Sequence, residues 1–325
     1  MEPPLLTYTP QCRWCGKGPL TFQYIFDREL GLKDLIPLDR FVMERCEACG
    51  TFQVNPHPGE SLARAYFQRP ELYLQAADPD GAVGSNIARA EARRGEYQEY
   101  VAATLARLPE GGAILDIGAG TGLALSLFPD RYRRVAVEPN PLAAQKCRER
   151  GLDVLEDWAE TLKAPREPLC ALIFNQSLDH FPRPDLMLGR ALNWLAPGGL
   201  ILLTGLVNPN GVAARITGPA HRLWHPFHQV YPPRDALAAK LRAHGFRTLA
   251  FWRPYFHTPH GSCWALAKGI YQLAKAWALQ SRVGVPSPPW PGSVYGLLAQ
   301  KTLLFQPLPA LDVSRRDQKP LSTTP

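Results

Sequence analysis

The sequence contains no run of about 18 consecutive apolar residues, the length that a membrane-spanning helix needs. Its longest apolar stretch, around Gly199 to Val207, is only as long as a strand. The amino terminus, MEPPLLTYTP, lacks the basic segment followed by an apolar stretch that marks a secretory signal. We therefore expect a cytoplasmic protein without a membrane span, in which the cysteines stay reduced.

Long runs of basic residues are also missing. The net charge is +7, but no five basic residues are consecutive, and no basic stripe is interleaved with aromatic residues. We interpret the charge as arginines scattered over solvated helix faces. The sequence thus does not favour a nucleic-acid partner, although attraction to an acidic substrate stays open.

The chain has enough apolar residues for a sizeable core. Apolar residues make up 46% of the 325, which suffices for one α/β domain of roughly 200 residues and a smaller module. Residues 1–60 hold two Cys-x-x-Cys pairs, 61–111 have apolar positions at helical spacing, and 112–305 alternate short apolar runs with amphipathic stretches. Residues 306–325 turn to Pro, Ser, Thr and charge. We expect a small ribbon, a helical connector, an α/β domain and a disordered tail.

The alternation over residues 112–305 predicts seven strands, in a mostly parallel sheet flanked by helices. The expected strands are 113–117, 134–138, 153–156, 169–175, 200–204, 246–252 and 294–304. Expected helices include 141–150, 184–195 and 233–244. Prolines stand at or near the helix starts, and Gly151, Gly198 and Gly245 come just after the ends, as is usual for helices.

The strongest motif is a glycine-rich loop directly after the first of these strands. AILDIGAGTG, residues 113–122, has glycine at 118, 120 and 122, and a helix is expected from near Leu123. The missing side chains let the backbone turn sharply and approach a ligand closely, beside the free amides of a helix N-terminus. A nicotinamide-binding loop would need glycine at Leu123, and a kinase-type phosphate loop would need a nearby lysine, so neither fits.

This Asp-x-Gly-x-Gly-x-Gly pattern resembles that of the class I S-adenosylmethionine-dependent methyltransferases. The resemblance implies a Rossmann-like fold, and it implies that the loop residues contact the cofactor: Asp116, Gly118, Ala119, Gly120 and Gly122. Glu138 supports it, because it stands sixteen positions after Gly122 at the end of the second expected strand. An acid at this sheet edge can accept hydrogen bonds from both ribose hydroxyls.

Later motifs follow in the order of that family. By resemblance, Asp157 matches the acid that receives the adenine amino group, and Trp158 matches the side chain that covers the ring; a surface acid beside a buried tryptophan is the alternative. Asn175 begins NQSLDHF, which resembles the family's loop beneath the methionine half of the cofactor. The run LAPGGLILL, 195–203, resembles the entry into the fifth strand. The resemblance covers nearly all of residues 100–305.

The cysteine pairs, Cys12-Arg-Trp-Cys15 and Cys46-Glu-Ala-Cys49, form two expected metal-binding knuckles. A two-residue gap lets both thiolates of a turn face one ion, and the glycine after each second cysteine lets the backbone curl. Seven cysteines, an odd number in a reduced protein, also suit metal ligands and free thiols better than disulfides. We expect all four to hold one structural Zn²⁺ ion; free thiols or a redox pair are the alternative.

The residues after Cys49, TFQVNPHP and then LARAY at 62–66, resemble those of bacterial methyltransferases with an N-terminal zinc ribbon. Members of that group often act in making decorated sugars, cell-surface polysaccharides or secondary metabolites. The resemblance implies a small-molecule or sugar-type acceptor, without naming it.

Two histidines are the candidates for a catalytic base. Methyl transfer from a sulfonium is an in-line displacement, so the enzyme must mainly align an acceptor lone pair. A hydroxyl or an acidic carbon also needs a base, and histidine suits neutral pH. The candidates are His180 and His228, the latter in a segment rich in histidine and aromatic residues, 221–231. A pocket-shaping role for His180 and a structural hydrogen bond for His228 are the alternatives.

We therefore predict an S-adenosylmethionine-dependent methyltransferase that acts at oxygen or carbon of a small-molecule or carbohydrate-linked acceptor. Methylation of RNA, with the ribbon binding the substrate, is one alternative, and the mixed charge of the ribbon argues against it. A non-catalytic protein that binds the cofactor is another, and the intact glycine loop and Glu138 argue against that.

Overall fold

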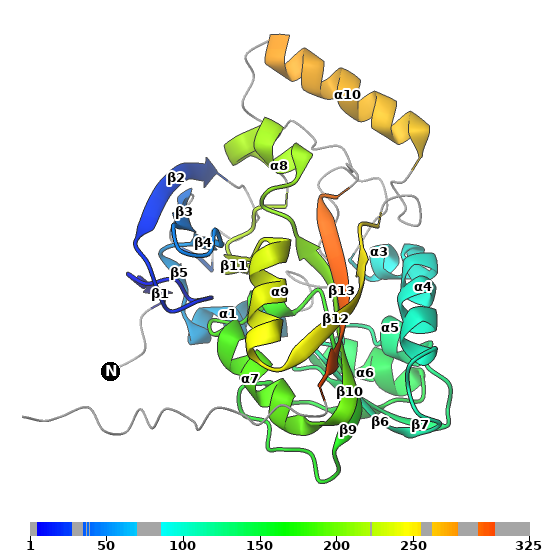
Figure 1. Ribbon diagram of the computed structural model, residues 1–325. Coiled ribbons are helices and arrows are strands. Elements are labelled where there is room, and N and C mark those ends of the chain that lie inside the picture. Colours follow the sequence, from blue (N-terminus) through cyan, green and yellow to red (C-terminus); the bar gives the residue numbers. More distant parts are fainter. Residues whose placement is uncertain are drawn as a thin grey trace, which may run out of the picture.

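The computed structural model describes residues 5–27, 35–36, 38, 40–69, 86–221, 223–254, 262–278 and 292–302. Over these residues the chain forms a seven-stranded sheet with helices on both faces, and a four-stranded sheet beside it (Figure 1). The expected tail, 306–325, lies outside the described residues. Within the described part, no helix has both the length and the apolar character needed to cross a membrane.

The large sheet confirms the predicted seven-stranded, mostly parallel arrangement. Its order is β12-β13-β10-β9-β6-β7-β8, and β13 alone runs antiparallel to its neighbours. The strands are β6 (Gly112–Ile117), β7 (Tyr132–Val137), β8 (Asp153–Leu155), β9 (Leu169–Asn175), β10 (Leu195–Val207), β12 (Phe246–Trp252) and β13 (Val294–Lys301). β10 is longer than expected at both ends, because it pairs with β9 from Leu195 and with β13 up to Val207.

Side chains that alternate along the strands build one core on each face of this sheet. On one face, Ile114 of β6 lies in a cluster with α4 (Arg94–Leu105), α5 (Leu123–Ser126) and α6 (Pro141–Glu149). On the other face, Leu115 clusters with α7 (Pro184–Trp194) and α9 (Arg234–Ala243). The three helices predicted at 141–150, 184–195 and 233–244 are therefore confirmed within about two residues.

The small sheet joins two distant parts of the chain. Its order is β11-β4-β3-β2, and every pairing in it is antiparallel. The strands are β2 (Leu20–Asp27), β3 (Arg40–Cys46), β4 (Phe52–Val54) and β11 (Val230–Tyr231). β11 comes from the connection between β10 and α9, and Trp224 and Phe227 of that connection share a core with Phe41 and Met43 of β3. The N-terminal strands and segment 221–231 thus pack as one unit.

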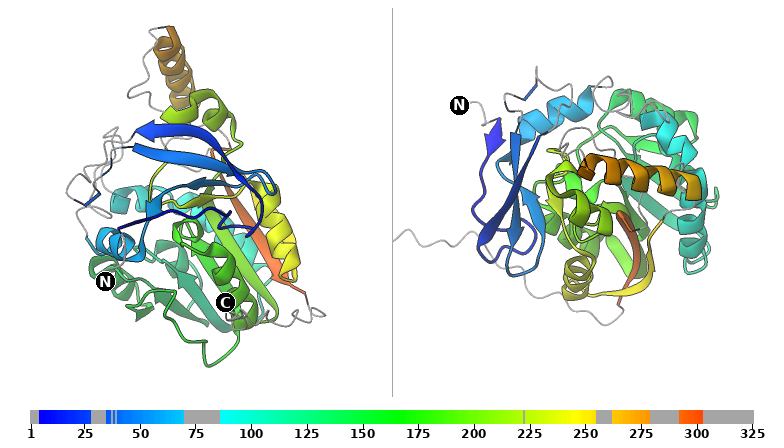
Figure 2. Two further views of the ribbon diagram at one scale, coloured as in Figure 1. Left: turned by 90° about the vertical axis from the view of Figure 1, so that its left-hand side faces the viewer. Right: turned by 90° about the horizontal axis from the view of Figure 1, so that it is seen from above.

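The remaining elements lie around these two sheets (Figure 2). They are β1 (Leu6–Thr7) paired with β5 (His57–Pro58), α1 (Glu60–Gln68), η1 (Leu178–His180), α3 (Asn86–Ala92), α8 (Val212–Thr217), η2 (Gly218–Ala220) and α10 (Cys263–Ala278). α1, α3 and α4 account for the described helices of the expected connector at 61–111.

Candidate functional site

A cavity opens at the carboxyl edge of the large sheet, where β6 and β9 are neighbours. The chain order of the strands reverses between these two, and this is the edge at which parallel sheets bind ligands. The empty space of the cavity, including the part open to solvent, is about 730 Å³. Strand ends, loops and α1 line it: Glu60, Ala63, Arg64, Phe67, Ile117, Gly118, Val137, Glu138, Pro139, Asp157, Trp158, Ala159, Glu160, Gln176, Ser177, His180, Phe181 and Pro182.

The three loop glycines are required for two different reasons. A Cβ atom on Gly118 would stand 2.7 Å from Cβ of Ser177, and one on Gly122 would stand 2.6 Å from Leu152 Cδ1. Close packing therefore excludes side chains at both positions. Gly120 instead faces open space, with no atom within 4 Å of such a Cβ, although its φ of +56° favours glycine. The neighbouring Ala119 turns into the core and donates its N–H to Val137 O over 3.1 Å.

Two buried carboxyl groups accompany this loop. Glu138 accepts hydrogen bonds from Gly120 N (2.8 Å) and Asn140 N (2.9 Å), and burial still raises its pKa to about 7. Asp116 is fully buried on β6, and neither of its carboxylate oxygens has a hydrogen-bond partner among the described residues. Burial, and then the charge of Glu138, raise the pKa of Asp116 to about 8. Carboxyl groups in such surroundings are typical of ligand sites rather than of packing alone.

The other expected cofactor residues lie at different places. Asp157 and Trp158 both line the cavity; Asp157 is exposed, and Arg64 of α1 stacks over the Trp158 ring at 5.0 Å. Asn175 is not among the lining residues, and its Oδ1 accepts a hydrogen bond from Thr204 Oγ1 over 2.7 Å. The residue after it, Gln176, lines the cavity instead.

The lining also includes Gln176, from the loop that begins at Asn175, and residues of α1. Gln176 has a φ of +56°, which is rare for a residue with a side chain and often occurs at functional loops. Its Nε2 donates to Tyr97 Oη over 3.1 Å. α1 covers the cavity with Ala63, Arg64 and Phe67, and no local motif in that helix marks it as part of this site.

Both candidate histidines meet at one buried acid, Asp179. Its Oδ1 lies 3.8 Å from His180 Nε2, and its Oδ2 lies 3.3 Å from His228 Nδ1. The two imidazole rings are 4.6 Å apart between centroids, and Phe67 stacks on His180. Burial, with a smaller effect of His228, lowers the pKa of His180 well below its usual value, so His180 is neutral at neutral pH. His180 lines the cavity, whereas His228 is not among the lining residues and contacts Asp179 and the His180 ring from segment 221–231.

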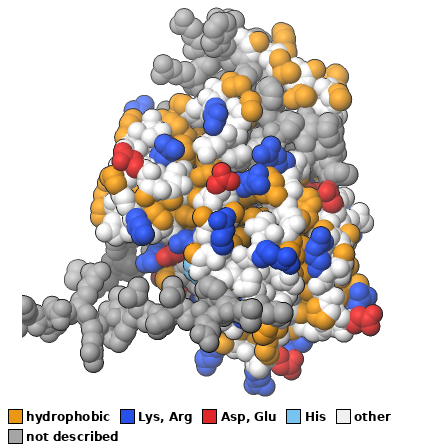
Figure 3. All heavy atoms as spheres, in the orientation of Figure 1, with side chains coloured by type: hydrophobic (Ala, Val, Ile, Leu, Met, Phe, Trp, Pro, Cys, Tyr) orange, Lys and Arg blue, Asp and Glu red, His pale blue; other side chains and the backbone are white. Residues whose placement is uncertain are grey.

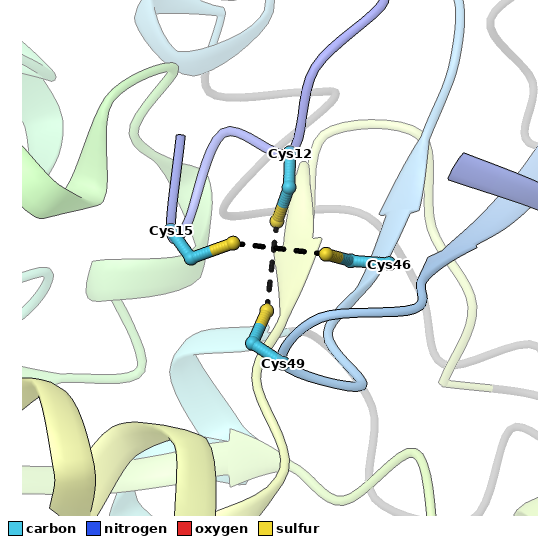
Figure 4. A group of neighbouring side chains, drawn as sticks. All are labelled: Cys12, Cys15, Cys46 and Cys49. Carbon is cyan, nitrogen blue, oxygen red and sulfur yellow. Dashed lines mark hydrogen bonds between the residues drawn. The ribbon is translucent and has the colours of Figure 1, made fainter. Parts of the chain in front are cut away.

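The four knuckle cysteines converge on one point (Figure 4). The Sγ atoms of Cys12 and Cys49 are 3.7 Å apart, and those of Cys15 and Cys46 are 3.6 Å apart. A tetrahedral ion with bonds of about 2.3 Å to sulfur requires about 3.8 Å between ligands, so the arrangement suits Zn²⁺. Hydrogen bonding to Cys49 and burial raise the pKa of Cys12, so four thiolates need a cation to stay together here.

Both knuckles curl as the sequence predicts. Gly16 and Gly50, which come after the second cysteine of each pair, have φ values of +68° and +72°. Their N–H groups donate to the carbonyl oxygens of Cys12 and Cys46, each over 2.8 Å.

Arg13, between the cysteines of the first knuckle, connects this cluster to the histidine segment. Its buried guanidinium donates to Gln229 Oε1 and Gln229 O, both over 2.6 Å, and to Val54 O over 2.8 Å. Gln229 N in turn donates to Asp179 O over 2.7 Å. Burial lowers the pKa of Arg13 to about 9, which still leaves it charged at neutral pH. The sequence gives no sign of this link, because its members are far apart along the chain.

Comparison with known proteins gives one family match. Residues 89–250 match a family model described as a methyltransferase domain. Among curated proteins, none matches the chain.

Solved structures with a similar chain path share little sequence with this protein. One is an S-adenosylmethionine-dependent methyltransferase, a possible histamine N-methyltransferase, from Thermotoga maritima: 19% identity, TM-score 0.44, covering 65% of this chain and 92% of that one. Another is the YcgJ protein from Bacillus subtilis, with 16% identity, TM-score 0.45, and 65% and 99% covered. A third is a methyltransferase of the same cofactor class from Archaeoglobus fulgidus, with 16% identity, TM-score 0.44, and 64% and 94% covered.

The family match agrees with the reversal of strand order, the glycine loop and the acid at the end of β7. Residues 89–250 therefore have both the sheet order and the family match of a methyltransferase domain.

Proposed function

We propose that this chain transfers a methyl group from S-adenosylmethionine to an oxygen or carbon atom of a small-molecule or carbohydrate-linked acceptor. The observation that carries the proposal is the pair of buried carboxyl groups, Asp116 and Glu138, beside a glycine loop at the cavity.

Glu138, which lines the cavity, and Asp116 and Gly120 on either side of the lining residues Ile117 and Gly118, suit this cofactor. Glu138 keeps lone pairs that can accept from ribose hydroxyls, even with two backbone amides bound to it. The unpartnered oxygens of Asp116 favour a positively charged ligand group close by. Gly120 leaves open the space that a side chain would fill. When bound, the cofactor supplies an electrophilic methyl group on a positively charged sulfur.

The histidines supply the proton acceptor that an oxygen or carbon acceptor needs. His180 faces the cavity in its neutral form and so has a free lone pair on one ring nitrogen. Asp179 lies against both imidazoles, and a carboxylate there stabilises an imidazolium after it has taken up a proton. We assign the role of base to this histidine pair, with His228 as the member that Asp179 holds most closely.

We also propose that Cys12, Cys15, Cys46 and Cys49 hold a structural Zn²⁺ ion. Four sulfur ligands close a tetrahedral site and leave no position for a substrate, so the ion would shape the N-terminal module and take no part in the transfer.

The test of the proposed function is calorimetric binding of S-adenosylmethionine and of its demethylated product. We expect dissociation constants of about the micromolar range for the wild type. Gly120→Arg should weaken binding at least ~hundredfold, because the new side chain fills open space in the loop.

The matched control is Gly151→Arg. Gly151 also has a positive φ (+72°) and open space around its Cβ position, but it stands after α6 and not in the glycine loop at residues 118–122. This variant should bind like the wild type. Absent binding in the wild type, or equal binding by Gly120→Arg, would refute the proposed function.

A further inference from the structure

One long segment of the chain is almost free of acidic residues. Residues 186–311 contain twelve Lys and Arg residues and a single acid, Asp235, whereas residues 1–185 contain 21 Lys and Arg residues and 26 acids. The formal charges of the two parts are therefore +11 and −5. Such an asymmetry indicates a polyanionic partner for the basic part.

Two helices of this basic part lie at one end of the molecule. α8 comes after the carboxyl end of β10, and α10 comes after the carboxyl end of β12, so both leave the sheet at the edge that carries the cavity. The two helices lie next to each other in all three ribbon views (Figures 1 and 2).

These helices expose large apolar side chains. On α8, Val212 and Ile216 are each 55% exposed. On α10, Trp264 is 72% exposed, Tyr271 67% and Ile270 49%. Figure 3 shows hydrophobic side chains gathered along this end of the molecule. Soluble proteins rarely leave such a group uncovered, and when they do it usually marks a binding surface.

Basic side chains accompany the apolar ones. Arg215 of α8, Arg253 after β12 and Lys268 of α10 are exposed, and Lys268 lies 5.3 Å above the Trp264 ring. Apart from its cysteine and its aromatic residues, the sequence of α10 has only three polar residues: Lys268, Gln272 and Lys275. The helix contains no acid.

We propose that the surface of α8 and α10, which exposes Val212, Arg215, Ile216, Trp264, Lys268, Ile270 and Tyr271, binds an anionic lipid bilayer. A helix with aromatic and aliphatic side chains, lysines and no acids has the composition of helices that lie in the membrane interface.

Two other partners fit the same face less well. Single-stranded nucleic acid is bound by aromatic rings and cations, but Val212, Ile216 and Ile270 offer no ring for a base to stack on. A second copy of the chain, docked face to face, would bring Arg215 and Lys268 of both copies together without acids between them. Anionic lipid satisfies both the apolar and the basic side chains.

The experiment is co-sedimentation of the full chain with vesicles of phosphatidylcholine, alone or mixed with phosphatidylglycerol. We expect binding to the mixed vesicles at ~0.05 M salt, and much less at ~0.5 M or without phosphatidylglycerol. The double variant Trp264→Glu/Tyr271→Glu should bind at least ~tenfold more weakly. Lys268→Glu should bind more weakly and with less dependence on salt.

Phe22→Glu is the matched control, because Phe22 on β2 is 62% exposed and lies on the acidic part of the chain. It should bind vesicles like the wild type. A second readout uses Cys263, which is exposed on α10, as the attachment point for a polarity-sensitive fluorophore. Its emission should shift to the blue when mixed vesicles are added. Circular dichroism and unfolding temperature confirm that each variant is folded.

Four results would overturn the proposal: no sedimentation of the wild type with mixed vesicles at low salt, unchanged binding by the folded double variant, binding to poly(U) RNA without binding to vesicles, or a change of oligomeric state in the double variant without any vesicle binding. None of these measurements involves the cofactor, so the proposal stands or fails apart from methyl transfer.

Discussion

Asp116 and Glu138 are buried carboxyl groups at the carboxyl ends of two paired strands, and burial raises their pKa values to about 8 and about 7. In the unfolded chain both would titrate near pH 4. Between about pH 4 and about pH 8 the folded state therefore holds protons that the unfolded state has released. Relative to high pH, these two groups contribute their full stabilising free energy of unfolding below about pH 4. This contribution is lost as the pH rises through the pKa values of the folded state.

This fall in stability with rising pH gives a prediction for Asp116→Asn. The ligand-free wild type should lose a few kcal/mol of unfolding free energy between about pH 5 and about pH 8, since one unit of pKa shift corresponds to about 1.4 kcal/mol. The variant should lose less, because only Glu138 then contributes a strongly raised pKa from this pair. Urea unfolding at several pH values measures both slopes. Asp153→Asn, at an exposed acid on β8, should keep the wild-type slope; an equal slope in Asp116→Asn would contradict the argument.

At this scale the spacing of the motif predicts where the backbone turns and where Glu138 stands, and the structure has the turn at residues 118–122 and Glu138 at the cavity. The contacts of these residues with a cofactor stay predictions. Asn175 is not among the lining residues: its Oδ1 accepts a hydrogen bond from Thr204 on β10, and Gln176, one position later, lines the cavity instead. A cofactor contact of Asn175 stays a prediction. At the end of a strand, the direction of a side chain depends on the turn that follows. Here that turn includes Gln176, whose positive φ is rare for a residue with a side chain. Asp179 is missed for another reason, because only the fold brings His228 to its second oxygen.

Segment 221–231 lies between η2 and α9 and contains β11 and three histidines. One of these, His228, has its Nδ1 atom 3.3 Å from Asp179 Oδ2. We predict that His228→Ala lowers turnover by about a hundredfold or more, the usual scale for loss of a general base. Affinity for the demethylated cofactor should change by less than about threefold, because the cavity lining comes from other residues. Transfer of labelled methyl groups to sugar-type acceptors, with calorimetry, measures the two quantities.

The control is His244→Ala. Among the described hydrogen bonds, the side chain of His244 makes one, between its Nδ1 and Lys240 O of the preceding helix (2.8 Å). This variant should keep wild-type turnover. If His228→Ala lost both cofactor binding and folding, His228 would be structural and the base would have to be His180. If it changed nothing, the acceptor would supply its own nucleophile, as an amine does.

The elements themselves divide into those that the sequence predicts and those that it does not. Most strands of the large sheet arise from apolar runs of strand length, which carry their own signal, whereas β8 has only two apolar residues. β11 has two residues and exists because Val230 and Tyr231 pair with Gln53 and Phe52 of β4. No local pattern in so short a strand can name a partner so far away. For the same reason the covering role of α1 is visible only in the fold.

Taken as a whole, the molecule has two modules that are not independent. β11 extends the N-terminal sheet, and Trp224 and Phe227 fill its core. Arg13 holds Gln229, and Trp14 Nε1 donates to Ala236 O of α9 over 3.3 Å. The cysteine knuckles therefore support both the ribbon and the segment that carries His228, so that removal of a metal ion would act beyond the ribbon.

Loss of the metal tests this coupling directly. We predict one zinc ion per chain by elemental analysis, and its release in Cys46→Ser, because three thiolates no longer close the site. Hydrogen exchange in this variant should be at least ~tenfold faster in β3 and β4, and also in segment 221–231, while the central strands β6 and β9 keep their protection. Cys263→Ser, at the exposed cysteine of α10, should retain the zinc and the wild-type exchange pattern. If faster exchange were confined to β3 and β4, Arg13 and β11 would not transmit the loss of zinc to His228. If the wild type were free of zinc and its N-terminal strands were still folded, the four cysteines would not be a metal site.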